Sequence, residues 1–167
     1  MLSLLLHWVH LLSVVVWIGG VAYTVLVMLP NMQLIALRDR ARLVPRILSR
    51  FLKIVWTSIA LIAVSGLYRV VVVLNITGIE PLLLSRYGNI LTLKLLLVAA
   101  LIAVAASLTV RIYPRIVSHV ATHINDGPDA YKCPACGSIV GTIRLHLKTG
   151  LALAAVIIFL AATLRGA

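Results

Sequence analysis

The first apolar segment of the chain carries two histidines and a polar stripe. In HWVHLLSVVVWIGG the stripe consists of residues at helical spacing, namely His10, Ser13, Trp17 and Gly20. His7 precedes His10 by one helical turn. Because polar groups are costly in lipid, such a stripe is expected to face other helices. Both imidazoles are therefore candidate ligands for a metal or a cofactor.

Two further ionisable residues fall at a similar depth in other apolar segments. Arg69 lies in SGLYRVVVVLN and Lys94 in YGNILTLKLLL. At about 1.5 Å per helical residue, each lies about 9 Å from the outer end of its segment, as does His10. A mid-membrane Arg or Lys costs about 2.5 to 3.5 kcal/mol on the insertion scale, so a function is the first hypothesis. Alternatively, the long side chains extend to the headgroups and His10 donates to a carbonyl one turn away.

An imidazole between two cations matches haem better than a bare metal ion. Neutral imidazole ligates iron, and Arg69 and Lys94 would pair with the two anionic propionates. A metal cation would be repelled by both side chains, because the four acidic residues all lie between the apolar segments: Asp39, Glu80, Asp126 and Asp129. The pattern predicts haem b in the outer half, with His7 or His10 as axial ligand.

A second, weaker constellation opens the last apolar segment. In GTIRLHLKTGLAL, His146 is flanked by Arg144 and Lys148. Residues two apart do not share a helix face, so one haem contacting all three is not expected. The alternative is an ordinary basic flank that happens to include a histidine. If haem binds here, His119 or His123 is the candidate for the opposite ligand.

One hydrophilic stretch, SHVATHINDGPDAYKCPACGS, holds both cysteines of the chain. His119, His123, Cys133 and Cys136 form H-x3-H-x9-C-x2-C, which supplies the four N/S ligands of a tetrahedral zinc or copper site. A reversible thiol pair, or loop residues without a ligand, are the alternatives. Met28 and Met32 are four residues apart and would suit copper(I), although such methionines more often pack.

The segments that must position these residues are membrane spans. The 167-residue chain is 62% hydrophobic and 11% charged, against about 25% charged in a soluble domain. Four apolar runs are long enough to cross the hydrocarbon core, at about 3–29, 52–74, 88–110 and 145–164. We expect a single all-α integral membrane domain over 1–167, an antiparallel four-transmembrane-helix bundle in the plasma membrane.

The net charge of +11 is concentrated in the two connections that follow the first and third spans. By the positive-inside rule these connections are cytoplasmic, the second being the CPAC-bearing loop 111–144, and both termini lie outside. The basic segment LIALRDRARLVPRILSRFLKIV is amphipathic and is expected to lie along the interface. Anionic lipid, rather than nucleic acid, is the predicted partner of the charge.

Three segments are similar to those of a known family. HLLSVVVWIGG and RYGNILTLKLLLVAA resemble the H-x6-W-x-G-G and Y-G-x-x-L-x-x-K segments of CopD-like copper-resistance membrane domains, and IALIAVSGLYRV resembles their glycine-bearing second helix. HemJ-type haem-binding protoporphyrinogen oxidases show a related His-bearing first helix and Lys-bearing third helix. The resemblance implies a small helical membrane domain with His10 and Lys94 as its polar positions.

Two functions follow. The first is a membrane-embedded haem b protein that transfers electrons or handles haem or porphyrin. Such a protein could have a redox partner or a quinone as its partner and could act as an oxidoreductase. The alternative is a copper transport or tolerance protein that uses His10 outside and the methionine, histidine and cysteine ligands inside. Neither function excludes a homo-oligomer.

Overall fold

The computed structural model describes residues 1–73, 86–123 and 134–163, and these residues are helical almost throughout. Four helices are long and apolar enough to cross a membrane, at Leu2–Asn31, Asp39–Val72, Gly88–Thr122 and Ser138–Ala162. The all-α character and the four spans are therefore confirmed, and the chain is a multi-pass membrane protein. The closed antiparallel bundle and the outside position of both termini stay predictions.

The first span consists of α1 (Leu2–Tyr23), the π-helix η1 (Thr24–Met28) and α2 (Leu29–Asn31), followed by the 3-10 helix η2 (Met32–Leu34). The second is α3 (Leu37–Tyr68) with the π-helix η3 (Arg69–Val73). The third is α5 (Arg86–Ser107), the π-helix η4 (Leu108–Ile112) and α6 (Tyr113–His123). The fourth is α7 (Pro134–Thr163).

Two of the π-helical segments contain a threonine whose hydroxyl bonds to the backbone of the preceding turn. The hydroxyl of Thr24, in η1, donates to the carbonyl of Gly20 at 2.8 Å. The hydroxyl of Thr109, in η4, donates to the carbonyl of Ala105 at 2.8 Å. Ser and Thr hydroxyls commonly satisfy backbone groups that an irregular membrane helix releases. Both threonine hydroxyls are therefore paired within their own helix.

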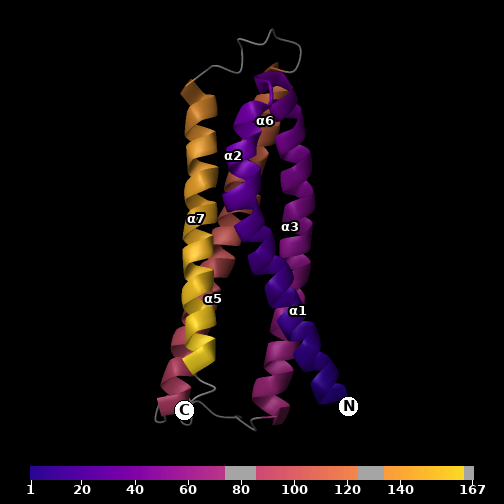
Figure 1. Ribbon diagram of the computed structural model, residues 1–167, viewed down its shortest axis with the longest axis vertical. Coiled ribbons are helices and arrows are strands. Elements are labelled where there is room, and N and C mark those ends of the chain that lie inside the picture. The colour runs from indigo at the N-terminus through magenta and orange to yellow at the C-terminus, as the bar shows by residue number, and fades with distance from the viewer. Residues whose placement is uncertain (74–85, 124–133, 164–167) are drawn as a thin grey trace.

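The amphipathic segment was expected to lie along the membrane interface, but it does not form a separate helix. It is the first half of α3, which runs without a break through Pro45 into the second span (Figure 1). At 1.5 Å per residue, the 32 residues of α3 extend about 48 Å, well beyond a hydrocarbon core of about 30 Å. Its exposed basic side chains recur along one face, at Arg42, Arg46, Arg50 and Lys53. The helix continues because extending an existing helix is easier than starting a new one.

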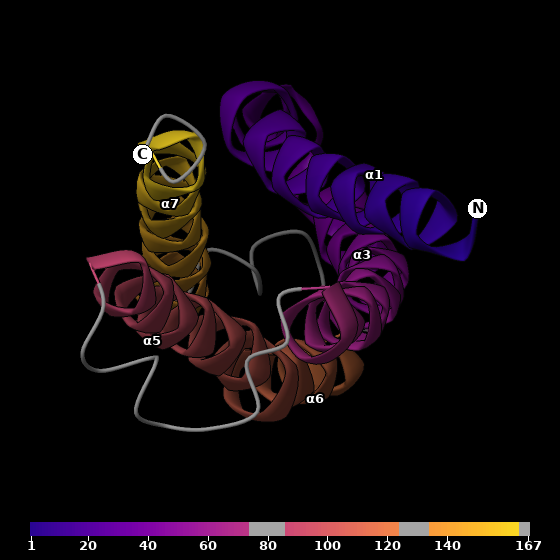
Figure 2. The same cartoon turned by 90° about the horizontal axis from the view of Figure 1, so that it is seen from below.

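The helices pack as two principal pairs, α1 with α3 and α5 with α7, and α6 also packs on α3. Figure 2 shows α1 crossing α3 at an angle, with α5 and α7 on the other side of the molecule. The start of α1 and the end of α7 lie at the same end, at the bottom of Figure 1. We call this the pocket end, and the opposite end, where α3 begins and α6 ends, the basic end.

The core is formed at mid-height by side chains from all four spans. The most buried include Trp17 of α1, Val55 of α3, Leu108 of η4 and Leu147 of α7, each exposed by 6% or less. Between the helices the indole nitrogen of Trp56 donates to the hydroxyl of Thr109 at 3.0 Å. The rigid centre is thus separate from the polar residues at the pocket end.

This bond gives a first prediction. In a double-mutant cycle of Trp56→Phe and Thr109→Val, we expect a coupling energy of about 0.6 kcal/mol, the average for hydrogen bonds between membrane helices. Equilibrium unfolding in mixed detergent micelles measures it. The cycle cancels the packing changes of each single variant, so a coupling near zero would show that the bond does not stabilise the α3–η4 contact.

Candidate functional site

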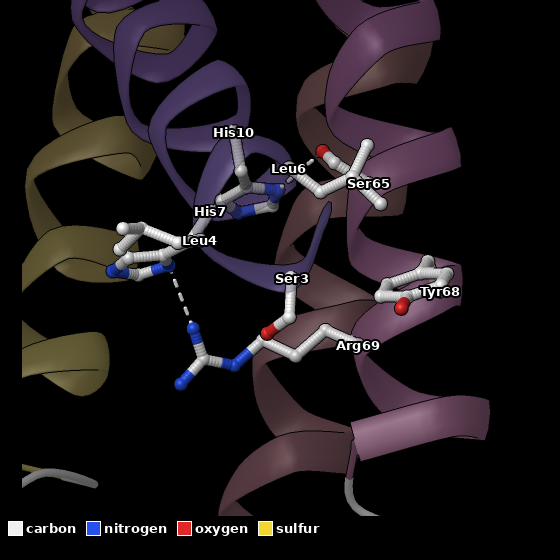
Figure 3. Close-up of a pocket in the computed structure, with 8 residues that line it drawn as sticks. All are labelled: Ser3, Leu4, Leu6, His7, His10, Ser65, Tyr68 and Arg69. Atoms are coloured by element: carbon white, nitrogen blue, oxygen red, sulfur yellow. Dashed lines mark hydrogen bonds between the residues drawn. The ribbon is translucent and has the colours of Figure 1, made fainter. Parts of the chain in front are cut away.

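A pocket of about 260 Å³ lies at the pocket end, between the first turns of α1 and the end of α3. Figure 3 shows its lining, which combines six polar or ionisable side chains with two leucines: Ser3, Leu4, Leu6, His7, His10, Ser65, Tyr68 and Arg69. Both histidines that the sequence singled out, and one of its two cations, therefore reach the same pocket.

His10 is held by a serine on the neighbouring helix. Its Nδ1 lies 2.9 Å from the hydroxyl oxygen of Ser65, which is 3% exposed. The Ser65 hydroxyl donates its proton to the carbonyl of Leu61, at 2.5 Å. Since a hydroxyl has only one proton, Nδ1 of His10 must be the donor in the His10–Ser65 bond. This fixes the tautomer with a hydrogen on Nδ1 and a lone pair on Nε2, the form that ligates a metal.

His7 has the opposite tautomer. A guanidinium nitrogen of Arg69, the first residue of η3, lies 2.7 Å from Nδ1 of His7. Arginine has donors but no acceptor, so Nδ1 of His7 accepts and its proton is on Nε2. His7 can offer a lone pair to a metal only after Arg69 has moved. Of the two imidazoles, His10 is therefore the one prepared as a ligand.

Lys94 completes the predicted group of polar residues. It is half-buried on α5, and its charge, like that of Arg69, acts on the His10 ring. Arg69 and Lys94 also act on one another electrostatically. The charges of Arg69 and Lys94 therefore both act on His10, but only Arg69 of these two cations lines the pocket.

Close packing between α1 and α3 orients the His10 ring. A Cβ atom built on Gly66 would lie 3.5 Å from Cε1 and 3.8 Å from Nδ1 of His10. The glycine therefore lets the ring lie against the α3 backbone, as small residues do at membrane helix interfaces. Further along the stripe Ser13 and Trp17 are both 6% exposed. The prediction that this stripe faces other helices is confirmed.

The second predicted constellation does not converge. The Nδ1 of His146 lies 2.9 Å from the carbonyl of Thr142, and its Nε2 lies 3.3 Å from the hydroxyl of Ser107. A carbonyl can only accept, so Nδ1 donates and Nε2 accepts from Ser107. Both ring nitrogens are engaged, while Arg144 and Lys148 are exposed. This geometry favours the alternative, a basic flank with a histidine that joins two helices.

The H-x3-H-x9-C-x2-C motif falls largely outside what the structure describes. Cys133 lies outside the described residues, and only the backbone of His123 and Cys136 is described, at the ends of α6 and α7. The third helix does continue past Pro114, so His119 and His123 occupy helical i, i+4 positions on α6. Among the described residues there is no group of three or more His, Cys, Asp or Glu. The zinc or copper site in this loop stays a prediction.

The two methionines lie at the basic end of the first span. Met28 ends η1 and is half-buried, and Met32 begins η2 and is buried. The chain is helical between them, which keeps the i, i+4 spacing that the sequence indicated. Their role as copper ligands is not tested by the structure, and burial of Met32 is also what packing requires.

Sequence reasoning missed the residues that orient and enclose the site. Ser65 and Gly66 stand in AVSGLYR, directly before Arg69, and Ser3 and Tyr68 also line the pocket. A usable signal was present, because Ser65 precedes Arg69 by four residues and so lies on the same helix face. A serine next to a glycine was not recognised as the partner of a histidine on another helix.

The pocket is large enough for a small ligand. The pocket, at about 260 Å³, lies below the ~300–1,000 Å³ that is usual for drug-sized ligands and cofactors. One lone pair on His10 and further donors around it can hold an ion and a small companion group. Among the described residues, neither histidine is paired with a carboxylate.

Comparison with known proteins addresses the family directly. The family model for copper resistance protein D, CopD, matches residues 45–164. The matched region includes Arg69, Lys94 and His146 and begins after the first span, so the motif around His10 lies outside it. No curated protein and no solved structure matches the chain. Because the matched region covers more than half of the chain and the second, third and fourth spans, this protein belongs to the copper resistance protein D (CopD) family.

Proposed function

We propose that the protein handles copper within the membrane, as a copper transport or copper-tolerance protein, and that His10 is its ligand at the pocket end. The observation that carries the proposal is the hydrogen-bond chain from His10 through Ser65 to the carbonyl of Leu61. It leaves the lone pair of His10 on Nε2, in a ring that lines a pocket, in a chain of the CopD family. Imidazole is a suitable ligand for copper.

A route across the membrane needs a second position at the basic end. Met28 lies 18 residues after His10, about 27 Å along a helix, which is close to the thickness of the hydrocarbon core. Thioether and thiolate sulfur select copper(I), so Met28 and Met32 would receive the ion, and the histidines and cysteines of the cytoplasmic loop would accept it next. In this proposal copper enters outside at His10 and leaves inside through sulfur ligands.

Haem b is the other function that the sequence indicated. The family match supports the copper alternative, and the pocket is smaller than the usual cofactor site. The cations Arg69 and Lys94 near His10 suit haem propionates as well as an anion beside copper, so the family match decides for copper as the function proposed.

The test is a copper(I) titration of the purified protein against a chromophoric chelator, together with a visible spectrum. We expect stoichiometric copper binding at the pocket end and no Soret band. A Soret band in protein that takes up no copper would exclude the proposal and restore the haem interpretation.

The role of Ser65 gives a prediction on affinity. Ser65→Ala removes the side-chain acceptor for Nδ1 of His10, so the ring loses a bond that helps to fix its tautomer and orientation. We expect copper(I) affinity to fall by about tenfold, the lower end of the effect of losing a partner that orients a metal ligand. Ser58→Ala is the matched control, because Ser58 is an equally buried serine two turns earlier on α3. Equal affinities of the two variants would contradict the role assigned to Ser65.

The orientation of the chain gives another prediction. The only two cysteines, Cys133 and Cys136, are expected to face the cytoplasm, since basic residues flank their loop. A membrane-impermeant maleimide should therefore label them in inverted vesicles but not in whole cells. A cysteine-free variant carrying Leu2→Cys, at an exposed position at the start of α1, should give the reverse result. Labelling of the wild-type cysteines in whole cells would place the pocket on the cytoplasmic side.

A further inference from the structure

The pocket end holds two positive charges that the described part of the chain does not neutralise. Arg69 bonds to His7, which accepts as a neutral imidazole, and Lys94 lies close enough to interact with the charge of Arg69. Asp39 is the one acidic residue among those the structure describes, and it lies in the first turn of α3, at the basic end. It is about 45 Å along the helix from Arg69. Two cations at membrane depth, with no counter-charge near them among the residues that the structure describes, call for an anionic partner.

The same pocket offers donors suited to an anion. The guanidinium of Arg69 has five N–H groups in a fixed fork, and a single hydrogen bond to His7 leaves most of them for another acceptor. The hydroxyl groups of Ser3 and Tyr68 line the same cavity (Figure 3). Anions bound by charged donors form shorter and stronger hydrogen bonds than neutral groups do.

Copper alone is a poor match for this environment. The lone pair of His10 attracts a metal cation, whereas the charges that act on the His10 ring, those of Lys94 and Arg69, repel it. An anion between the metal and the two cations would attract all three charges and so offset both repulsions. The anion and the copper ion would then each raise the affinity of the site for the other, by the same factor.

We infer that the pocket binds copper together with a small anion, such as a halide or a thiolate, which Arg69 holds beside the metal at His10 while the charge of Lys94 attracts it from α5. The inference rests on the proposed function and defines its substrate, which is an ion pair or an anionic copper complex rather than the bare cation. The pocket volume of about 260 Å³ accommodates a metal ion with one or two small companions. A lipid headgroup phosphate shares this chemistry and is the competing source of the negative charge.

The test uses chloride as the probe. Copper(I) affinity is measured by chelator competition in phosphatidylcholine nanodiscs, with chloride raised from about 1 to 100 mM against gluconate at constant ionic strength. We expect the affinity of wild type to rise at least about fivefold over this series, the lower limit of typical coupling between two ligands. Arg69→Gln and Lys94→Gln should lose this dependence. Because copper–chloride complexes in solution are the same for every variant, the difference between variants reports the site itself.

Two controls separate the alternatives. Glu80, in the connection between η3 and α5, is the acidic residue nearest in sequence to Arg69, and Glu80→Gln should keep the chloride dependence. A dependence that appears only in Glu80→Gln would show that this carboxylate, not an external anion, neutralises the cations. Nanodiscs with anionic phosphatidylglycerol test the lipid. If anionic lipid raises copper affinity while chloride has no effect in phosphatidylcholine, the charge comes from a headgroup and the inference is overturned.

A measurement without copper distinguishes failure of this inference from failure of the proposed function. Chlorine NMR line broadening should detect chloride binding to His10→Ala, and the double variant His10→Ala/Arg69→Gln should lose it. Copper binding that is independent of chloride in every variant would overturn the inference and leave the proposed function intact. Chloride binding by a wild type that binds no copper would overturn the copper function and, with it, the paired substrate.

Discussion

Replacing His10 by Ala is expected to remove copper binding at the pocket end, with a loss of affinity larger than the ~100-fold upper limit for a supporting partner. The reason is that His10 supplies the coordinating nitrogen itself, whereas Ser65 only orients it. Competition between the purified variant and a copper(I) chelator measures the loss. The absence of a structural change is checked by circular dichroism and thermal unfolding.

His7→Ala is the matched comparison for His10→Ala. The two histidines are one turn apart on the same helix and line the same pocket, but Nδ1 of His7 is already bonded to Arg69. We therefore expect His7→Ala to change copper affinity by less than about tenfold, below the range for a required partner. Equal losses in the two variants would show that the tautomers do not decide which imidazole binds the metal.

Gly66→Leu is expected to lower copper affinity as much as His10→Ala does, although Gly66 has no side chain that could coordinate the metal. A Cβ atom at this position already lies at contact distance from the His10 ring, so the larger Leu side chain must displace the ring from Ser65. Overpacking of this kind also costs about 1 to 3 kcal/mol in stability. Copper titration and thermal unfolding of the same sample give both quantities.

Gly66→Ala is the control for Gly66→Leu. It distinguishes displacement of the His10 ring from disruption of α3 by any side chain at this position. At 3.5 Å the added methyl group makes ordinary contact with Cε1 of His10 and requires no movement. This variant should bind copper like wild type. If Gly66→Leu kept wild-type affinity, the ring would not need its position against α3, and the interpretation of the Ser65 bond would fail with it.

The sequence predicted the elements well because their signal is simple. Four apolar runs of membrane length define the spans, and the spacing of Ser13 and Trp17 defines the buried face of the first one. Depth along a helix follows from the rise per residue, and it is the basis for the prediction that His10, Arg69 and Lys94 lie at one level. Such properties depend on one segment at a time.

What the sequence did not provide depends on contacts between segments. Whether Nδ1 of His10 donates to Ser65, or Arg69 bonds to His7, depends on the angle at which α1 crosses α3. The length of α3 was also missed, since its basic half resembles an interfacial helix when taken alone. The sequence-based prediction of haem rested on the charges near His10, because the size of the pocket could not be known from the sequence. The family match favours copper.

The π-helical turns have a consequence for the evolutionary history of the chain. A π turn contains one residue more than an α turn. The helix can therefore take up one extra residue there while the residues on either side still point in the same directions. Losing one residue from Thr24–Met28 would leave a regular α-helix in which the residues on either side still face the same way, because the π turn holds that extra residue. Losing one between His10 and Trp17 would instead rotate the imidazole by about 100° relative to the core. Single-residue gaps among relatives should therefore gather at η1, η3 and η4 and be avoided in the rest of the spans.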